Sequence, residues 1–140
     1  MITLEQFLTL LNGDLMREWA AAIQYKQHAA IVNGPLFAFA ETVLSAHADE
    51  EICHAEKVMD LIVFLGGIPT VETAMSSTAA VSFVLMQLDL QSEQEAIARY
   101  TERIAQAREL NLPATEAVLL SIVADEQHHA NDLKSIIGAA

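Results

Sequence analysis

Cationic side chains are scarce in this sequence. Its 140 residues include 7 Lys plus Arg against 19 Asp plus Glu, which gives a formal net charge of −12 at pH 7. A nucleic-acid-binding protein normally carries a basic patch, so we expect no nucleic-acid partner. An acidic surface raises the local concentration of cations, but it also serves solubility alone.

Cysteine and long hydrophobic runs are nearly absent as well. The single Cys53 excludes an internal disulfide, which agrees with a reducing compartment. The longest apolar runs, such as residues 61–65, are far too short to span a membrane. The first residues lack the basic and then apolar layout of a signal peptide. We therefore expect a cytoplasmic protein without a membrane partner.

The remaining composition predicts one all-α domain over residues 1–140. Hydrophobic residues make up 53% of the chain, and they recur at three- and four-residue spacing rather than in strict alternation. Gly, Pro and Asn interrupt this pattern at three places. Thr3 is the expected N-cap of the first helix, and Ser77 or Thr78 that of the third. The expected helices cover residues 3–32, 35–65, 78–110 and 113–138.

The connection between the second and third helices decides the topology. The short turns between the first and second helices and between the third and fourth require the helices that they join to be antiparallel. Residues 67–78 can stretch about 40 Å, nearly the ~45 Å length of a 30-residue helix. An up-down-up-down bundle needs only a few residues there. We therefore expect a four-helix bundle in which this loop crosses over and leaves the second and third helices parallel.

One pattern of acids and histidines occurs twice. A lone Glu precedes a Glu-x-x-His motif by 33 positions in the first copy and by 31 in the second. All six residues fall near the middle of the four expected helices, and a Glu and a His three apart share a helix face. The candidate ligands are Glu18, Glu51, His54, Glu95, Glu126 and His129.

These residues predict a site for two metal ions. Apolar neighbours at helical spacing place them in what would otherwise be core positions. A buried carboxylate costs of the order of several kcal/mol unless it is paired or bound to metal, and few cationic side chains lie at this depth. Two divalent ions would neutralise four carboxylates. Oxygen-rich ligation with one imidazole per ion favours iron, for which manganese or zinc can substitute.

Acids that precede the motif glutamates are candidates for a supporting role. Asp125-x-x-His128 is a competing motif displaced by one residue, but Cys53 stands at the equivalent place in the first copy. Symmetry therefore favours the ligands named above. We expect Asp125 to accept a hydrogen bond from His54, and Glu50 from His129, since such acids fix the imidazole tautomer.

Two further residues have open interpretations. Tyr25 lies seven positions after Glu18, where its phenol would bond a ligand carboxylate or supply an electron, or would simply pack in the core. His47 either forms an outlying iron site with Glu50 or is a partly exposed helix residue. His28 and His128 are expected at the surface.

The motifs resemble the ferritin-like superfamily, and bacterioferritin most closely. The resemblance covers nearly the whole chain. It implies a ferroxidase centre in which O2 or H2O2 oxidises two Fe(II) ions, with Glu51 and Glu126 bridging them. It also implies iron storage or defence against oxidative stress. The segments that carry it are Leu11-Asn12, Gln24-Tyr25, Asp49 to Glu56, Phe64 to Pro69, Glu95 to Ile97 and Asp125 to His129.

Two departures from bacterioferritin limit what the resemblance implies. Ile52 occupies the place of the haem-ligating Met, so we expect no haem bound there. The sequence ends at Ala140, where the cage-forming relatives continue into a fifth helix, so we expect no such helix. A homo-oligomer of at least two subunits is expected, and a dimer and a cage closed by other contacts both stay open.

Two other functions remain as alternatives. One is a peroxide-scavenging di-metal enzyme similar to rubrerythrin or manganese catalase. A rubredoxin-type iron site is excluded within this chain by its single cysteine. The other is a structural or interaction bundle that holds adventitious metal. Rapid oxidation of two Fe(II) per subunit would distinguish an oxidoreductase from such a bundle.

Overall fold

Four long α-helices and one short 3-10 helix lie within residues 1–139, the part of the chain that the computed structural model describes. The α-helices are α1 (Leu4–Ile31), α2 (Ala40–Phe64), α3 (Ser82–Glu109) and α4 (Pro113–Ala139), and η1 (Pro35–Phe37) precedes α2. These residues contain no strand, so the expected all-α class is confirmed. Within residues 1–139, none of the helices combines the length and the hydrophobicity that a membrane span requires.

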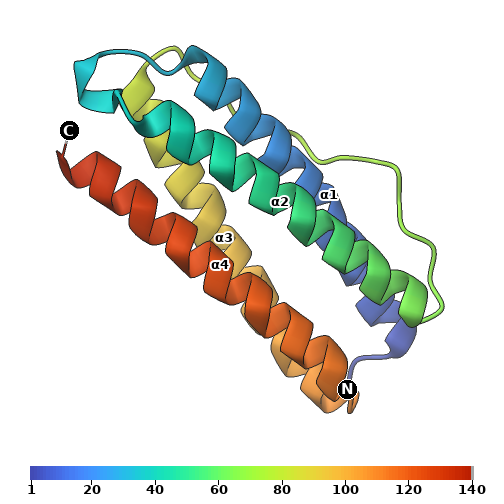
Figure 1. The fold of residues 1–140 in the computed structure, drawn as a ribbon. Helices are drawn as coiled ribbons and strands as arrows, with labels where there is room; N and C mark the ends of the chain where they lie inside the picture. Colours follow the sequence, from blue (N-terminus) through green and yellow to red (C-terminus); the bar gives the residue numbers. More distant parts are fainter. Residues whose placement is uncertain (140) are drawn as a thin grey trace.

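The helices form two antiparallel pairs. α1 packs along α2, and α3 packs along α4. The long segment 65–81 returns beside α1 to the opposite end of the bundle, so α2 and α3 run in the same direction (Figure 1). Thr70 N–H donates to Asn12 Oδ1 at 2.8 Å, and Ala74 N–H donates to the carbonyl of Met16 at 3.1 Å. The expected crossover is confirmed.

Turn residues set most helix ends as the sequence predicts. Thr3 caps α1 by accepting a hydrogen bond from the backbone of the first turn. Gly66 and Asn111 follow α2 and α3 with φ of 89° and 59°, the left-handed conformation that ends a helix. Pro35 begins η1 rather than α2, which starts five residues later at Ala40.

The start of α3 differs from the prediction. Ser77 and Thr78 do not cap it, because both are bound to α1. Ser77 N–H donates to Gln24 Oε1 at 2.8 Å, and Thr78 Oγ1 donates to Gln27 Oε1 at 2.7 Å. The chain therefore stays extended along α1 and turns into the helix only at Ser82.

Two buried apolar clusters fill the bundle, one toward each end, with a layer of buried polar side chains between them. One cluster centres on Leu11, Leu15, Val58, Ile62, Tyr100 and Leu119; the other centres on Tyr25, Leu44, Leu85, Met86 and Leu133.

Candidate metal centre

Six ionisable side chains from all four helices meet in this middle layer. α1 and α3 each contribute one carboxylate, and α2 and α4 each contribute a Glu and a His three positions apart. Each of the six is at most 2% exposed. They are Glu18, Glu51, His54, Glu93, Glu126 and His129.

The side chains divide into two overlapping groups. In each group, one ligand atom per residue lies within 4.8 Å of those of the others. Glu51 and Glu126 belong to both groups, and each group adds one carboxylate and one imidazole of its own. One group is completed by Glu18 and His54, the other by Glu93 and His129. This arrangement is that of two adjacent cation positions with two shared carboxylates.

The α3 carboxylate is Glu93, so the prediction of Glu95 is wrong. Glu95 is exposed, and its Oε1 accepts a hydrogen bond from Gln91 Nε2 at 3.2 Å. Two positions along a helix rotate a side chain by about 200°, which turns Glu95 away from the bundle interior. Glu93 precedes Glu126 by 33 positions, the spacing by which Glu18 precedes Glu51. Equal spacing in the two copies was the signal that could have identified it.

Each of the unshared ligand candidates has one polar atom engaged by a neighbour outside the cluster. His54 Nε2 lies 2.9 Å from Asp125 Oδ2, and His129 Nε2 lies 2.8 Å from Glu50 Oε2, as predicted from the sequence. These contacts leave Nδ1 of both rings facing the cluster. The carboxylates of Glu18 and Glu93 accept hydrogen bonds from the phenols of Tyr100 and Tyr25.

The atoms that face the cluster have no hydrogen-bond partner. Among the described residues, eight buried side-chain polar atoms lack one, and six of these belong to the six cluster residues. His54 Nδ1 and Glu126 Oε1 approach to 3.0 Å, as do His129 Nδ1 and Glu51 Oε1, but neither contact has hydrogen-bond geometry. Buried polar groups are normally satisfied. Six convergent orphan atoms, four oxygens and two imidazole nitrogens, fit a pair of divalent cations.

Burial and mutual repulsion shift the protonation of the cluster. Burial raises the pKa of Glu51 and Glu126 well above 4.5, and the charges of neighbouring carboxylates raise both further. Burial alone lowers the pKa of His129, but its contact with Glu93 and the charge of Glu126 raise it to about 9. The pKa of His54 also rises, since three carboxylates surround its ring. The cluster therefore holds protons that a bound cation would displace.

Comparison with known proteins agrees with this geometry. The pattern that defines the ferritin-like domain matches residues 8–140. The chain belongs to the ferritin-like family. Bacterioferritin of Mycobacterium leprae is 32% identical over 130 residues, which cover 91% of this chain and 81% of that protein. The resemblance to bacterioferritin is thus confirmed.

Solved structures of ferritin-like proteins superpose closely on this one. A ferritin-like diiron-carboxylate protein from Bacillus anthracis has a TM-score of 0.91 at 30% identity, and the match covers 96% of both chains. A bacterioferritin-related dodecameric thioferritin from Bacteroides fragilis has a TM-score of 0.90 at 28% identity, covering 98% of this chain and 87% of that one.

Other predicted residues of this ferritin-like protein lie close to the cluster. Tyr25 is buried and bonds to Glu93, one of the contacts considered for it. His47 is only 2% exposed, so it is not a partly exposed helix residue. It does not pair with Glu50 either: its ring stacks on His129 with centroids 4.0 Å apart, and its Nε2 lies 2.9 Å from Asp132 Oδ2.

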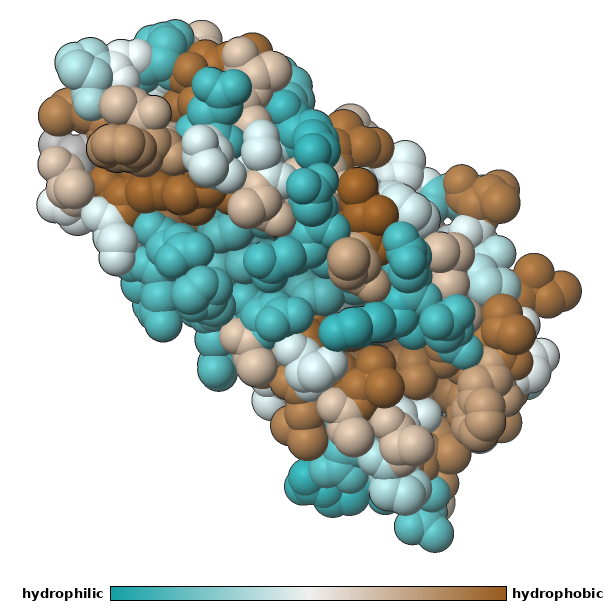
Figure 2. Space-filling view, in the orientation of Figure 1, coloured by the Kyte–Doolittle hydropathy of each residue, from teal (hydrophilic) through white to brown (hydrophobic). Residues whose placement is uncertain are grey.

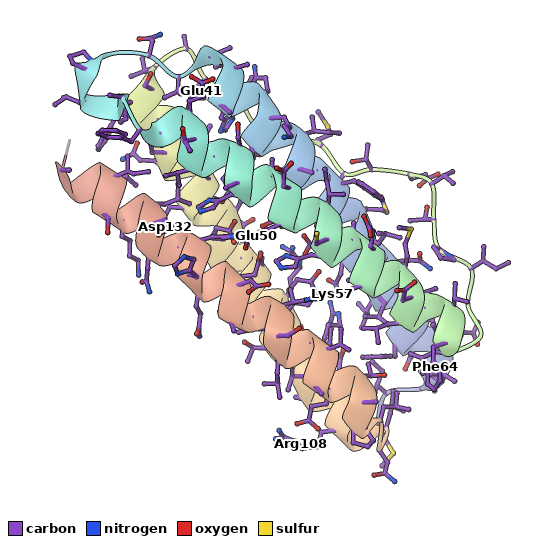
Figure 3. All side chains as sticks on the ribbon, viewed as in Figure 1. Glu41, Glu50, Lys57, Phe64, Arg108 and Asp132 are labelled. Carbon is purple, nitrogen blue, oxygen red and sulfur yellow. The ribbon has the colours of Figure 1, made fainter. Side chains whose placement is uncertain are left out.

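The surface above the centre is polar. Figure 2 shows a hydrophilic belt across the middle of the face in view. Glu50, Lys57 and Asp132 lie there, beside the gap between α2 and α4 (Figure 3). Glu50 and Asp132 are partly exposed and contact the rings of His129 and His47. Polar side chains thus connect solvent to His129, the candidate ligand histidine of α4.

The remaining histidines and Ile52 have distinct environments. His128 is exposed, as expected. His28 is fully buried, and the prediction of a surface residue is wrong: Nδ1 lies 2.8 Å from the Asp89 carboxylate and Nε2 lies 2.8 Å from the carbonyl of Ser77. Ile52 faces outward and, with Trp19 and Ile23 of α1, lines a shallow groove.

Proposed function

We propose that this protein binds two Fe(II) ions in the buried cluster and oxidises them with O2 or H2O2. The observation that carries this proposal is the set of six buried, convergent atoms without hydrogen-bond partners. An oxygen-rich donor set with one imidazole per ion suits iron, with manganese or zinc as substitutes. When bound, the iron supplies the redox chemistry.

The chain's own residues would hold the ions at two positions. Glu18 and His54 would bind one ion, Glu93 and His129 the other, and the shared carboxylates of Glu51 and Glu126 would bridge them. Asp125 and Glu50 would keep the imidazole Nε2 atoms protonated, so that each Nδ1 stays available as a ligand. Burial of all six excludes water from the inner side of the site.

This chemistry supports a role in iron handling, as storage or as defence against oxidative stress. The relatives named bacterioferritin support the first role. A peroxide-scavenging enzyme similar to rubrerythrin or manganese catalase is the second candidate, and the diiron-carboxylate neighbour from B. anthracis is compatible with it. Haem ligation is not part of the proposal, since Ile52 has no ligating atom.

We place this function in one cytoplasmic di-iron domain that forms a homo-oligomer. Trp19, Ile23 and Ile52 line a groove on the outer α1–α2 face, and Ile23 is 52% exposed. Such a face would be covered in a dimer along these helices. The dodecameric neighbour supports assembly beyond a dimer.

Anaerobic Fe(II) loading followed by exposure to O2 or H2O2 tests the proposal. We expect two Fe(II) per subunit and rapid oxidation by at least one oxidant, with Glu51→Gln and Glu126→Gln strongly impaired. Glu95→Gln is the matched control and should behave as wild type. Faster turnover with H2O2 and no accumulation of iron would favour peroxide scavenging. Absence of specific metal binding would refute the proposal.

A further inference from the structure

Helices α1 and α3 carry the same series of polar residues. In both helices, an acid begins the series. A Glu lies four positions after it, a Tyr lies seven positions after the Glu, and a basic residue lies three positions after the Tyr. Each residue of α3 lies 75 positions after its counterpart in α1. The series are Asp14, Glu18, Tyr25 and His28 in α1, and Asp89, Glu93, Tyr100 and Arg103 in α3.

These eight residues pair across the bundle in four rungs. Since the helices are antiparallel, each acid meets the Tyr or basic residue of the opposite series. The outer rungs join an acid to a basic side chain, and the inner rungs are carboxylate–phenol hydrogen bonds. The rungs are Asp14–Arg103 at 2.8 Å, Glu18–Tyr100, Glu93–Tyr25 and Asp89–His28 at 2.8 Å.

The inner rungs differ from the outer ones in charge. Arg103 neutralises Asp14, whereas a phenol donates a hydrogen bond and leaves the carboxylate charge in place. Burial and nearby carboxylates raise the pKa of both Tyr25 and Tyr100 well above 10, so the phenols stay neutral. Two of the four carboxylates of the candidate metal centre, Glu18 and Glu93, face these neutral donors.

Each phenol also occupies one oxygen of its carboxylate. Tyr100 takes Oε1 of Glu18 and Tyr25 takes Oε1 of Glu93, while Oε2 of each carboxylate is buried without a partner. Building on the proposed function, we infer that Tyr100 is a positioning residue that presents Glu18 to one metal ion through a single oxygen. Tyr25 does the same for Glu93 at the other ion.

The alternative is that Tyr100 only satisfies its own buried hydroxyl and fills space. In that case, its replacement by Phe would affect both metal positions equally or neither. A positioning role instead weakens only the position that Glu18 serves. Variants that keep a single metal position distinguish these two roles of Tyr100. The His129→Ala background retains Glu18 with His54, and the His54→Ala background retains Glu93 with His129.

Co(II) titration of the apoprotein, followed by its visible absorption, tests this assignment. We expect Tyr100→Phe to weaken Co(II) binding by about 10–100-fold in the His129→Ala background, the usual effect of losing a ligand's outer partner. In the His54→Ala background its effect should stay within about threefold. Tyr25→Phe should show the reverse preference. Retained binding in one background demonstrates that the variant is folded.

The outcomes separate this inference from the proposed function. If the wild type binds two Co(II) ions and Tyr100→Phe weakens Co(II) binding equally in both backgrounds, or in neither, the inference is overturned and the proposed function is not. Wild type that binds no Co(II) would overturn the proposed function and this inference with it.

Discussion

Replacing Glu93 and Glu95 separately by Gln gives the sharpest test of which α3 carboxylate serves the centre. Glu93 is 2% exposed and belongs to one of the two candidate ligand groups, whereas Glu95 is exposed. Glu93→Gln preserves the size of the side chain and removes one negative charge from the cluster. Glu95→Gln makes the same chemical change two residues away and is therefore a matched control.

The size of the effect follows from binding linkage. A ligand at 100 times its Kd stabilises the folded state by about 2.7 kcal/mol per site. For a chain of this length about 1 kcal/mol corresponds to roughly 3 °C in Tm, so each metal ion should raise Tm by about 8 °C. Loss of a ligand should weaken one site by at least the ~10–100-fold observed for outer partners. That removes about 1.3–2.3 kcal/mol, or about 4–7 °C of the metal-induced shift.

Thermal unfolding with and without Co(II) measures this difference. Glu93→Gln should lose about 4–7 °C of the metal-dependent increase in Tm, and metal analysis should show weaker binding of one of the two ions. Glu95→Gln should keep the wild-type increase within about 1 °C. Equal behaviour of the two variants, or a loss confined to Glu95→Gln, would show that Glu93 is not a ligand.

Three further predictions concern protonation and a turn. Burial lowers the pKa of His28, but Asp89 and a backbone carbonyl together raise it above 6.5. The stabilisation that protonated His28 provides is therefore fully present below about pH 6.5, and it is lost as pH rises through the pKa of the folded state. Urea unfolding should show a stability decrease of at most about 1.4 kcal/mol per pH unit that is absent in His28→Gln. Binding of two metals at pH 7 should release at least two protons per subunit, from Nδ1 of His54 and His129, measured by indicator dye; release of fewer than one would contradict the assigned ligand atoms. Gly66→Ala should destabilise the fold by about 1 kcal/mol in the same urea assay, because φ at this position is 89°.

Most of the fold could be predicted because local residues determine it. Apolar periodicity defined the helices, and Gly34, Gly66, Asn111 and Pro113 marked their ends within a few residues. The crossover followed from the length of one loop. The start of α3 could not be predicted in this way, since long-range hydrogen bonds to Gln24 and Gln27 hold the loop extended.

The candidate site was predicted less completely than the fold. Five of the six cluster residues came from the motif and from depth along each helix. Depth could not separate Glu93 from Glu95, which differ by about 3 Å along the helix axis. The decisive variable is the face, and both glutamates have apolar neighbours at helical spacing. Tyr100 was missed because its partner Glu18 is 82 positions away in the chain.

The buried acids of the centre have few cationic protein partners that could offset their negative charge. Arg103 is the one Lys or Arg among the buried residues described, and it bonds to Asp14 rather than to the cluster. Within the cluster, only His54 and His129 offer positive charge against four carboxylates. Removing charges from water without adequate pairing destabilises a fold, and apolar residues in the same layer would join the two core clusters directly. Neutralisation by two divalent cations, as proposed, would account for both the acids and the interrupted core, which a purely structural bundle would have no reason to retain.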